Sequence, residues 1–439
     1  MNFAESLSYL LSLGNEVLAM KLGLASTEKL LAALGNPQNN FLKIQVAGTN
    51  GKGSTCAFLD SICLGANIKT GLYTSPHLVS ITERIKLGGE EIGEEDFARH
   101  ATRVREISEN LVAKGELETV PTFFEQVTAI AVSAFAEAKI ELAILETGLG
   151  GRFDSVTATR AEIAALTPID YDHEKILGGT LSEIASEKAA IIRERMKIVV
   201  SPQKAEAMRV ILERCVEARV SPLLNGCEYF PDDCGEVGFK TPNEIYPRVR
   251  IGLEGEHQYE NACLAINLAE ILSMDFGFSI SGGEIYEGLG KARHKGRLEW
   301  WNHTRRNILF DGAHNIAGAR ALRNYLQKYC PESKIAFVFG AMRDKNLSAI
   351  AEILFPLAED LILTEPDNAR CEKVEELEKY AERVIDKSKI FLVPDVFDAV
   401  DSAIRIALKY PAESNSFVCV TGSLYLVGEA QKALTESVL

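Results

Sequence analysis

The stretch AGTNGKGST (residues 47–55) follows the apolar run KIQVAG (residues 43–48) and precedes a segment with helical composition. The apolar run predicts a buried strand, and the glycines predict a tight turn between that strand and the helix. Backbone N–H groups of such a turn can surround a polyphosphate, and the helix N-terminus adds a partial positive charge. Lys52 can then reach the terminal phosphates, and Ser54 or Thr55 can meet Mg²⁺. The stretch therefore predicts a phosphate-binding loop.

This loop departs from the general pattern G-x-x-x-x-G-K-[ST] at two positions. Val46 stands where the first glycine belongs, and Gly53 stands where Ser or Thr belongs. A plain glycine-rich turn is the alternative interpretation. We favour phosphate binding because a lysine between two glycines at a strand–helix junction is hard to explain otherwise.

Strand and helix patterns alternate on both sides of the loop. Strands are predicted at residues 71–76, 141–148, 162–169, 307–312, 334–340, 360–366, 389–395 and 416–422. Helices are predicted at residues 94–113, 122–138 and 258–273, and short antiparallel strands within 225–256. Such alternation predicts mostly parallel sheets that are covered by helices on both faces.

The fold class is therefore α/β, and the length of 439 residues suggests more than one domain. We expect a large N-terminal P-loop-type parallel-sheet ATPase domain over residues 1–294. A smaller C-terminal Rossmann-like α/β domain is expected over residues 295–439. The restart of the strand–helix alternation after residue 296 places this boundary.

Composition excludes several classes of protein. The formal net charge is -15 and no long Lys/Arg block occurs, which argues against a nucleic-acid partner. No segment approaches the ~20 apolar residues of a membrane span, and the N-terminus lacks the features of a signal peptide. The nine cysteines are scattered and never spaced as CxxC, which favours free thiols over zinc or disulfides. We therefore expect a cytoplasmic protein.

Two candidate metal ligands follow predicted strands. Glu146 opens ETGLGGRFD (residues 146–154) at the strand edge where α/β proteins bind ligands, so it can reach the Mg²⁺ of a nucleotide at Lys52. Taken alone, Glu146 is equally well interpreted as a surface carboxylate that binds no metal. His173 lies beyond the next strand within an anionic cluster, which favours a ligand, although a lone histidine is more often structural.

Lys188 lies on a predicted helix with Ala185, Ala189 and Ile192 around it. Burial among such neighbours would lower the pKa of the amine. The neutral amine could then take up CO₂ to form a carbamate, which behaves as an extra carboxylate. From these residues alone, the alternative of a surface pair between Glu187 and Lys188 is favoured.

The C-terminal half offers two further strand ends. DGAHN (residues 311–315) follows one strand, and Asp311, His314 and the preceding Arg297 could close over a nucleotide. TGSLYLVGE (residues 421–429) is a strand–turn–helix with small residues, suited to holding a carboxylate at a helix N-terminus. Both segments could equally be ordinary turns.

Taken together, the motifs resemble the folylpolyglutamate synthase and dihydrofolate synthase family, relatives of the Mur peptidoglycan ligases. They run nearly end to end in the family's order: GTNGKGST (48–55), YTSPHL (73–78), TERIKLGGEEI (82–92), PTFFEQVTA (121–129), ETGLGGRFD (146–154), DHEKILGGTLSEIASEKAAII (172–192), EGEHQYENACLA (254–265), GRLE (296–299), DGAHN (311–315) and VTGSLYLVGE (420–429).

The resemblance implies an ADP-forming ligase that requires Mg²⁺. ATP would phosphorylate a carboxyl group of dihydropteroate or a reduced folate, and the amine of L-glutamate would attack the acyl phosphate to form an amide. The resemblance leaves open whether the chain makes dihydrofolate, extends polyglutamate tails, or does both. We expect a monomer that binds neither nucleic acid nor membrane.

The resemblance also implies roles for individual residues. Nucleotide contacts would come from Asn50, Gly51, Lys52, Gly53, Ser54, Asn261, Arg297 and Asp311. Mg²⁺ ligands would be Ser75, Glu146 and His173. Lys188 would be carbamylated and, with Lys52 and His173, catalytic. The pterin acid and glutamate would contact Thr122, Phe123, Phe124, Glu125, Gly151, Arg152, Asp154, His314 and Ser423.

Some positions depart from the family pattern. Val156 and Thr157 in GRFDSVT replace the usual residues there, which bears on acceptor contacts, and Asp170, Ala190 and Lys295 are also unusual. Three rival readings are a P-loop kinase, a non-enzymatic Rossmann-type binding protein, and a Mur ligase that adds an amino acid to another acid. The second α/β domain and the polar strand ends disfavour the first two. The TFFE and TERIKLGG blocks favour the folate branch over the third.

Overall fold

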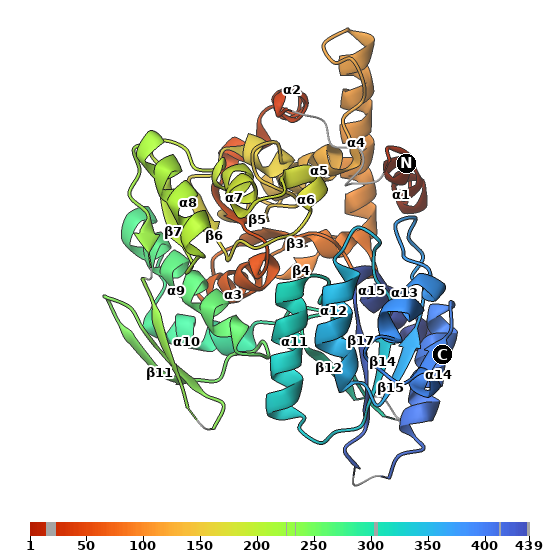
Figure 1. The fold of residues 1–439 in the computed structure, drawn as a ribbon. Coiled ribbons are helices and arrows are strands. Elements are labelled where there is room, and N and C mark those ends of the chain that lie inside the picture. Colours follow the sequence, from red (N-terminus) through yellow and green to blue (C-terminus); the bar gives the residue numbers. More distant parts are fainter. Residues whose placement is uncertain (15–22, 225, 233, 303–305, 412–413, 437–439) are drawn as a thin grey trace. The chain divides into compact units, whose positions relative to one another are not determined.

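The computed structural model describes residues 1–14, 23–224, 226–232, 234–302, 306–411 and 414–436. The chain forms two compact units (Figure 1). The first unit comprises Met1–Ile169, Leu177–Gly252 and Tyr259–Arg293, and the second comprises Asp170–Ile176, Leu253–Gln258 and His294–Leu439. The assignment of ATP and pterin-acid binding to residues 1–294 and of glutamate binding to 295–439 stays a prediction.

The first unit is built on an eight-stranded sheet with the order β4-β3-β2-β5-β1-β6-β7-β8. Its strands are β1 (Leu42–Ala47), β2 (Thr70–Tyr73), β3 (Ile85–Leu87), β4 (Glu90–Glu91), β5 (Leu142–Glu146), β6 (Ile163–Leu166), β7 (Lys197–Val200) and β8 (Leu223–Leu224). The six strands from β2 to β8 in this order are parallel. The antiparallel hairpin β3–β4 at one edge and the strands β7 and β8 at the other were not predicted. The strands flanking β1 are apolar on both faces, as expected of a sheet covered on both sides.

Helices cover the two faces of this sheet unequally. The helices are α1 (Phe3–Ser12), α2 (Ala25–Ala33), α3 (Lys52–Gly65), α4 (Glu94–Ala113), α5 (Phe123–Glu137), α7 (Leu181–Ala189), α8 (Ala205–Glu217), α9 (His257–Phe276) and α10 (Gly282–Lys291). The single-turn α6 (Glu174–Leu177) has residues assigned to both units. One face packs on α1, α2, α4 and α5 through one buried cluster and on α7 and α8 through another. Helix α3 packs on β1, β2 and β5 and is itself covered by α10.

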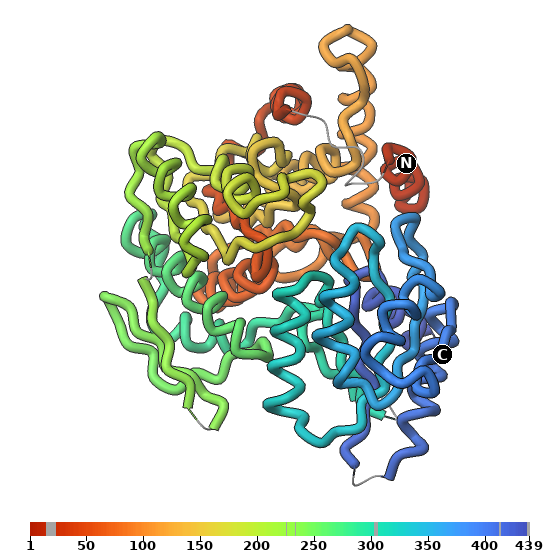
Figure 2. The backbone as a smooth tube through the Cα atoms, viewed as in Figure 1, coloured from red at the N-terminus to blue at the C-terminus, as the bar shows by residue number. Residues whose placement is uncertain are grey.

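A small antiparallel sheet has the order β11-β10-β9, which confirms the excursion predicted within residues 225–256. Its strands are β9 (Glu228–Pro231), β10 (Val237–Lys240) and β11 (Ile245–Val249). It lies at the margin of the first unit (Figure 2). Glu270 of α9 accepts hydrogen bonds from Thr241, Asn243 and Tyr246, which fixes this sheet to the helix.

The second unit holds a six-stranded sheet with the order β12-β13-β17-β14-β15-β16. The elements are β12 (Glu299–Asn302), β13 (Asn307–Asp311), β14 (Ile335–Phe339), β15 (Asp360–Leu363), β16 (Ile390–Leu392), β17 (Phe417–Thr421), α11 (Ile316–Tyr329), α12 (Leu347–Leu354), α13 (Val374–Ala381), α14 (Val396–Ala407) and α15 (Leu424–Glu436). Helices α11, α12 and α13 share a core with one face, while α14 and α15 pack against β13, β14, β15 and β17. All five predicted strands are present and parallel, and the antiparallel β12 is an addition.

The observed architecture confirms the predicted α/β class with a large parallel-sheet unit and a smaller α/β unit. Within the described ranges, no helix is both long enough and apolar enough to cross a bilayer.

Candidate active site

The predicted phosphate loop connects β1 to α3 at the carboxyl edge of the first sheet. Gly51, the residue before α3, has φ +88°, and a Cβ atom there would lie 2.1 Å from Oδ1 of Asn261. Gly48 has φ +146°, and a Cβ atom there would lie 1.9 Å from Oγ1 of Thr167. Both positions therefore require glycine, by conformation and by space. Asn261 of α9 therefore lies against this loop, and its contact with a nucleotide stays a prediction.

Lys52 is the first residue of α3, and its Nζ donates to the carbonyl oxygen of Thr49 at 3.1 Å. Ser54 and Thr55 are buried in the first turn. Among the described residues, Oγ1 of Thr55 has no hydrogen-bond partner. A helix N-terminus with a lysine and two hydroxyls is suited to hold the phosphates of a nucleotide.

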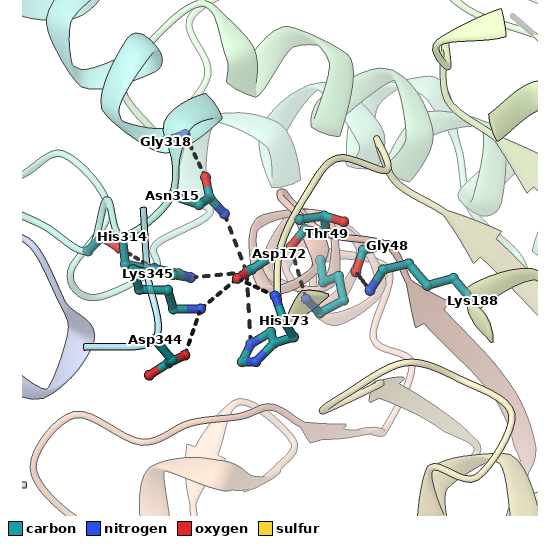
Figure 3. A network of polar contacts seen from close by, with 12 residues as sticks. Gly48, Thr49, Asp172, His173, Lys188, His314, Asn315, Gly318, Asp344 and Lys345 are labelled. Carbon is teal, nitrogen blue, oxygen red and sulfur yellow. Dashed lines mark hydrogen bonds and ion pairs between the residues drawn. The ribbon is translucent and has the colours of Figure 1, made fainter. Parts of the chain in front are cut away.

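Lys188 lies in the last turn of α7 and is only 5% exposed. Its Nζ donates to the carbonyl oxygen of Gly48 at 2.8 Å (Figure 3). The alternative of a surface pair with Glu187 is wrong, because Glu187 pairs instead with Arg152 at 2.7 Å. The predicted burial is confirmed, and the lysine reaches the phosphate loop from a helix 140 residues further along the chain.

Glu146 ends β5, is 5% exposed, and accepts the backbone N–H of Ser75 on Oε2 at 3.1 Å. This hydrogen bond brings together two of the three predicted Mg²⁺ ligands. A carboxylate and a hydroxyl are hard oxygen donors, and Mg²⁺ sites commonly use one or two carboxylates with substrate phosphates and waters. The pair therefore fits a magnesium ion beside the phosphate loop. Among the described residues, no group of three or more His, Cys, Asp and Glu side chains forms a protein-only metal site.

The predicted acceptor residues at the start of α5 have a local structural role. Thr122 and Glu125 form a capping box, in which Oε2 of Glu125 accepts the N–H of Thr122 at 2.7 Å. Thr27 of α2 donates to the other carboxylate oxygen of Glu125 at 3.1 Å. Phe124 lies over Gly148, where a Cβ atom would be 2.5 Å from the ring. The start of α5 therefore lies beside the loop that follows β5.

Asp154 organises the loop after β5. Its carboxylate accepts the N–H groups of Leu149 and Val156, each at 2.9 Å. Burial raises its pKa to about 6, while hydrogen bonds from Leu149, Val156 and Gly148 and the charge of Lys52 oppose that rise. In the same loop, a Cβ atom on Gly151 would lie 2.7 Å from the carbonyl oxygen of Glu187, so the loop packs against α7.

Residues 74–84 form another part of the first unit. His77 accepts a hydrogen bond on Nδ1 from Nε of Arg84 at 2.7 Å, and the Arg84 guanidinium lies 5.4 Å from the ring centre of Phe123. Burial, and then the charge of Arg84, lower the pKa of His77 to about 3. Glu83 accepts the N–H groups of Leu78 and Val79. The blocks YTSPHL and TERIKLGG thus meet in one hydrogen-bonded structure.

In the second unit, Asp172 is the centre of a polar network (Figure 3). Its carboxylate lies 2.5 Å from Nζ of Lys345, 3.6 Å from Nε2 of His314 and 3.5 Å from Nδ2 of Asn315. Burial alone would raise the pKa of Asp172, but the hydrogen bond with His314 and the charges of His314 and Lys345 hold it well below its usual range. His173 has φ +51° and lies 3.9 Å from the same carboxylate.

Asp311 ends β13 and accepts the N–H groups of Leu298 and Ala313, each at 3.0 Å. Burial raises its pKa, and the charge of Arg297 opposes this. A Cβ atom on Gly312 would lie 3.1 Å from a terminal nitrogen of Arg297, so Arg297 and Asp311 belong to one cluster. Ser423 precedes α15, and its Oγ accepts the N–H of Leu426 at 3.1 Å.

The structure therefore groups the predicted residues in two sets, one in each unit. The first unit brings together the phosphate loop, Ser75, Glu146, Lys188, Asn261, the start of α5 (residues 122–125) and the loop at 151–154. The second unit holds His173, Arg297, Asp311, His314 and Ser423. The sequence interpretation missed Lys345 as the partner of Asp172, and Arg84 as the partner of His77. Lys345 follows a strand of the second sheet, and Arg84 lies inside the block TERIKLGG. These positions were the signals in the sequence that could have indicated the two residues.

Comparison with known domains gives the class of protein. The Mur ligase middle domain matches residues 46–269, and the glutamate ligase domain of Mur ligases matches residues 296–424. The chain belongs to the Mur ligase family.

Its relatives within that family give the particular activity. A dihydrofolate synthase/folylpolyglutamate synthase of Bacillus subtilis is 35% identical over 424 residues, covering 94% of this chain and 95% of the relative. E. coli FolC in complex with DHPP and ADP has a TM-score of 0.86 and 26% identity, covering 100% and 99% of the two chains. A Yersinia pestis bifunctional folylpolyglutamate synthase/dihydrofolate synthase complexed with AMPPNP and Mn ion has a TM-score of 0.84 and 25% identity, covering 99% and 98%. The chain is thus an ATP-dependent, ADP-forming ligase of the folylpolyglutamate and dihydrofolate synthase type.

Proposed function

We propose that this ligase adds L-glutamate to dihydropteroate and to reduced folates, using MgATP. The observation that carries the proposal is the phosphate loop of the first unit. Lys52 lies at the N-terminus of the helix that follows this loop, and Lys188 donates a hydrogen bond to the carbonyl oxygen of Gly48, the first glycine of the loop. The B. subtilis relative, named for both synthase activities, and the DHPP bound to E. coli FolC support the acceptor class.

The chemistry starts at the acceptor carboxylate, which attacks the γ-phosphorus of ATP and releases ADP. The resulting acyl phosphate has a good leaving group, so the amine of glutamate can displace phosphate and form the amide with loss of a proton. We assign Lys52, Asn50, Gly51, Gly53 and Ser54 to the ATP phosphates, where the lysine charge stabilises the transferring phosphoryl oxygens. Asn261, Arg297 and Asp311 are assigned to the rest of the nucleotide.

Ser75, Glu146 and His173 are assigned to Mg²⁺, and the Mn ion of the Yersinia pestis structure supports the use of a divalent cation. When bound, the metal would neutralise phosphate charge in the transition state. Thr122, Phe123, Phe124, Glu125, Gly151, Arg152 and Asp154 are assigned to the pterin acid, and His314 and Ser423 to glutamate.

Lys188 is proposed to carry a carbamate. Its burial disfavours the charged ammonium form, and the neutral amine can add CO₂ with release of a proton. The carbamate keeps one N–H group, which can still donate to the carbonyl of Gly48. The new negative charge would then lie beside the phosphate loop.

We also propose that the protein acts as a monomer in the cytoplasm. All nine cysteines are free thiols, and six of them are buried, which suits a reducing compartment.

The test is an ADP-release assay with L-glutamate and, in turn, dihydropteroate, tetrahydrofolate and methylenetetrahydrofolate, with product mass as the second readout. We expect ADP release that requires both glutamate and an acceptor, and a product heavier by one glutamyl residue. ADP release without an amino acid would indicate a kinase or ATPase. Activity only with a UDP-sugar peptide would indicate a Mur ligase with another acceptor.

A further inference from the structure

Apart from Ser75, the residues of the blocks TERIKLGG (82–89) and YTSPHL (73–78) have no role in the function proposed above. TERIKLGG is the block considered first. Its most buried charged side chain is Arg84, which is 2% exposed. Arg84 ends the short helix Ile81–Arg84, next to β3. A guanidinium cannot be deprotonated in a protein, so a full positive charge lies inside the first unit. A buried charge is costly unless specific contacts stabilise it, so its contacts identify its role.

Arg84 contacts two residues that belong to different segments of the first unit. Nε donates to Nδ1 of His77 at 2.7 Å, and the guanidinium lies over the ring of Phe123 at 5.4 Å. His77 belongs to residues 74–80, which we call the serine loop because it contains Ser75. Phe123 is the first residue of α5. Arg84 therefore joins the serine loop to the start of α5.

The serine loop is held at further points by the same block. The carbonyl oxygen of Arg84 accepts the N–H of Thr74 at 3.0 Å. Glu83 accepts the N–H of Leu78 at 2.8 Å and those of Val79 and Ser80 at 3.2 and 3.3 Å. On the other side, the N–H of Ser75 donates to Glu146. Every contact of this set lies within the first unit.

The hydrogen bond between Arg84 and His77 also determines the tautomer of the imidazole. The Nε–H of an arginine can only donate, so Nδ1 of His77 must accept and the ring proton must be on Nε2. His77 is therefore oriented by Arg84 with its Nε2–H available as a donor. A change at either residue would release the ring orientation and remove the contact of the serine loop with the Arg84 side chain.

We propose that Arg84 and His77 are positioning residues of the ligase: they hold the serine loop against the start of α5, and thereby set the position of Ser75 relative to the acceptor residues Phe123 and Phe124. This inference rests on the proposed function, because it assumes that Ser75 and the start of α5 serve the metal and the acceptor. It adds two residues to which the proposed function assigns no contact with the nucleotide or with the reacting atoms.

Two histidine variants form a matched test. The amide oxygen of His77→Asn can occupy the place of Nδ1 and accept from Arg84, whereas His77→Gln puts its amide near the place of Nε2 and leaves Arg84 without that acceptor. We expect His77→Gln to raise the KM for the pterin acid by about tenfold, the effect of losing one charged hydrogen bond. His77→Asn should keep most of the acceptor affinity, and the KM for glutamate should change in neither variant.

A second readout is independent of turnover. Binding of Mn²⁺ to the protein with ADP, followed by electron paramagnetic resonance, should weaken in His77→Gln and Arg84→Met and be retained in His77→Asn. Arg105→Met is the matched control. The Arg105 guanidinium on α4 lies 4.8 Å from the ring centre of Tyr9 and pairs with Glu109, so its loss should change neither constant. If Arg84→Met does not fold, the two histidine variants still decide the question.

Equal behaviour of His77→Asn and His77→Gln would overturn the proposal, as would an unchanged KM and Mn²⁺ affinity in Arg84→Met. A loss of thermal stability with unchanged constants in the folded fraction would show a purely structural role and overturn it as well. Failure of the proposed function would look different, because the unmodified protein would then release no ADP in response to glutamate and a pterin acid.

Discussion

The Nζ atom of Lys188 lies 2.8 Å from the carbonyl oxygen of Gly48, so helix α7 is tied to the first glycine of the phosphate loop (Figure 3). The lysine is buried, and its neighbour Glu187 is engaged with Arg152. A charged amine at this position would add positive charge beside the loop, whereas a carbamate would add negative charge. The two possibilities make opposite predictions for substitutions at Lys188.

If Lys188 carries a carbamate, Lys188→Arg should be inactive, because a guanidinium keeps its proton at physiological pH and cannot take up CO₂. Lys188→Ala should also be inactive, and a short carboxylic acid added to the assay should restore part of the activity. A carbonyl signal after exposure to ¹³CO₂, present in the unmodified protein and missing in Lys188→Ala, would identify the modification by NMR. Full activity of Lys188→Arg would show that the side chain acts only as a cation.

Lys52→Ala should abolish turnover and leave the fold intact. The lysine starts α3, and within the described residues its side chain donates a hydrogen bond to the backbone oxygen of Thr49, so little packing depends on it. Losing a charge that stabilises the transferring phosphoryl group typically costs ~10²-fold or more in rate. The measurement is the rate of ADP release, with circular dichroism for the fold and Lys29→Ala on the surface as the control. Near-normal turnover would remove the phosphate-loop assignment.

Asp172→Asn should destabilise the second unit. The ion pair between Asp172 and Lys345 is over 90% buried on both sides, and removing one partner of such a pair leaves an uncompensated charge that costs about 3–5 kcal/mol. Urea unfolding measures the change, and Glu376→Gln, which breaks the exposed pair with Lys379, should shift the same transition by less than about 1 kcal/mol.

The pH dependence of this effect has a definite sign. The pKa of Asp172 is lowered in the folded state, so its stabilising contribution is present above the unfolded value of about 4 and is lost as pH falls through the folded value. The destabilisation by Asp172→Asn should therefore shrink in strong acid. A difference in unfolding free energy that stays constant from neutral pH to strong acid would contradict the assignment.

Asp154 should show the opposite sign. Burial raises its pKa to about 6, above the unfolded value of about 4, so its protonated form is favoured in the folded state. The contribution of Asp154 to stability is fully present below about pH 4 and is lost as pH rises through about 6. Asp154→Asn cannot titrate, so the unfolding free energy of the unmodified protein relative to this variant should fall across that range. Parallel profiles from pH 4 to 7 would contradict the raised pKa.

Much of the fold could be predicted from the sequence because its signals are local. The bounds of α4 agree with the predicted helix at residues 94–113, and the five predicted strands of the second unit are all present. The hairpin β3–β4, the parallel strands β7 and β8 and the edge strand β12 were not predicted. Each of these strands has two to four residues, and such short strands carry too little periodicity to be distinguished from turns.

The sequence by itself determined the residue types at the phosphate loop and the order of strands and helices, because a glycine-rich turn and an apolar run depend on neighbouring residues. Only the tertiary structure decided which distant side chains reach them. Lys188 could have been a surface partner of Glu187, and burial against Gly48 follows from how α7 packs beside β1. The spacing of residues also did not determine the partners of Asp172 and Arg84. Lys345 is 173 positions from Asp172, and Phe123 is 39 positions from Arg84, so the fold of the chain brings each pair together.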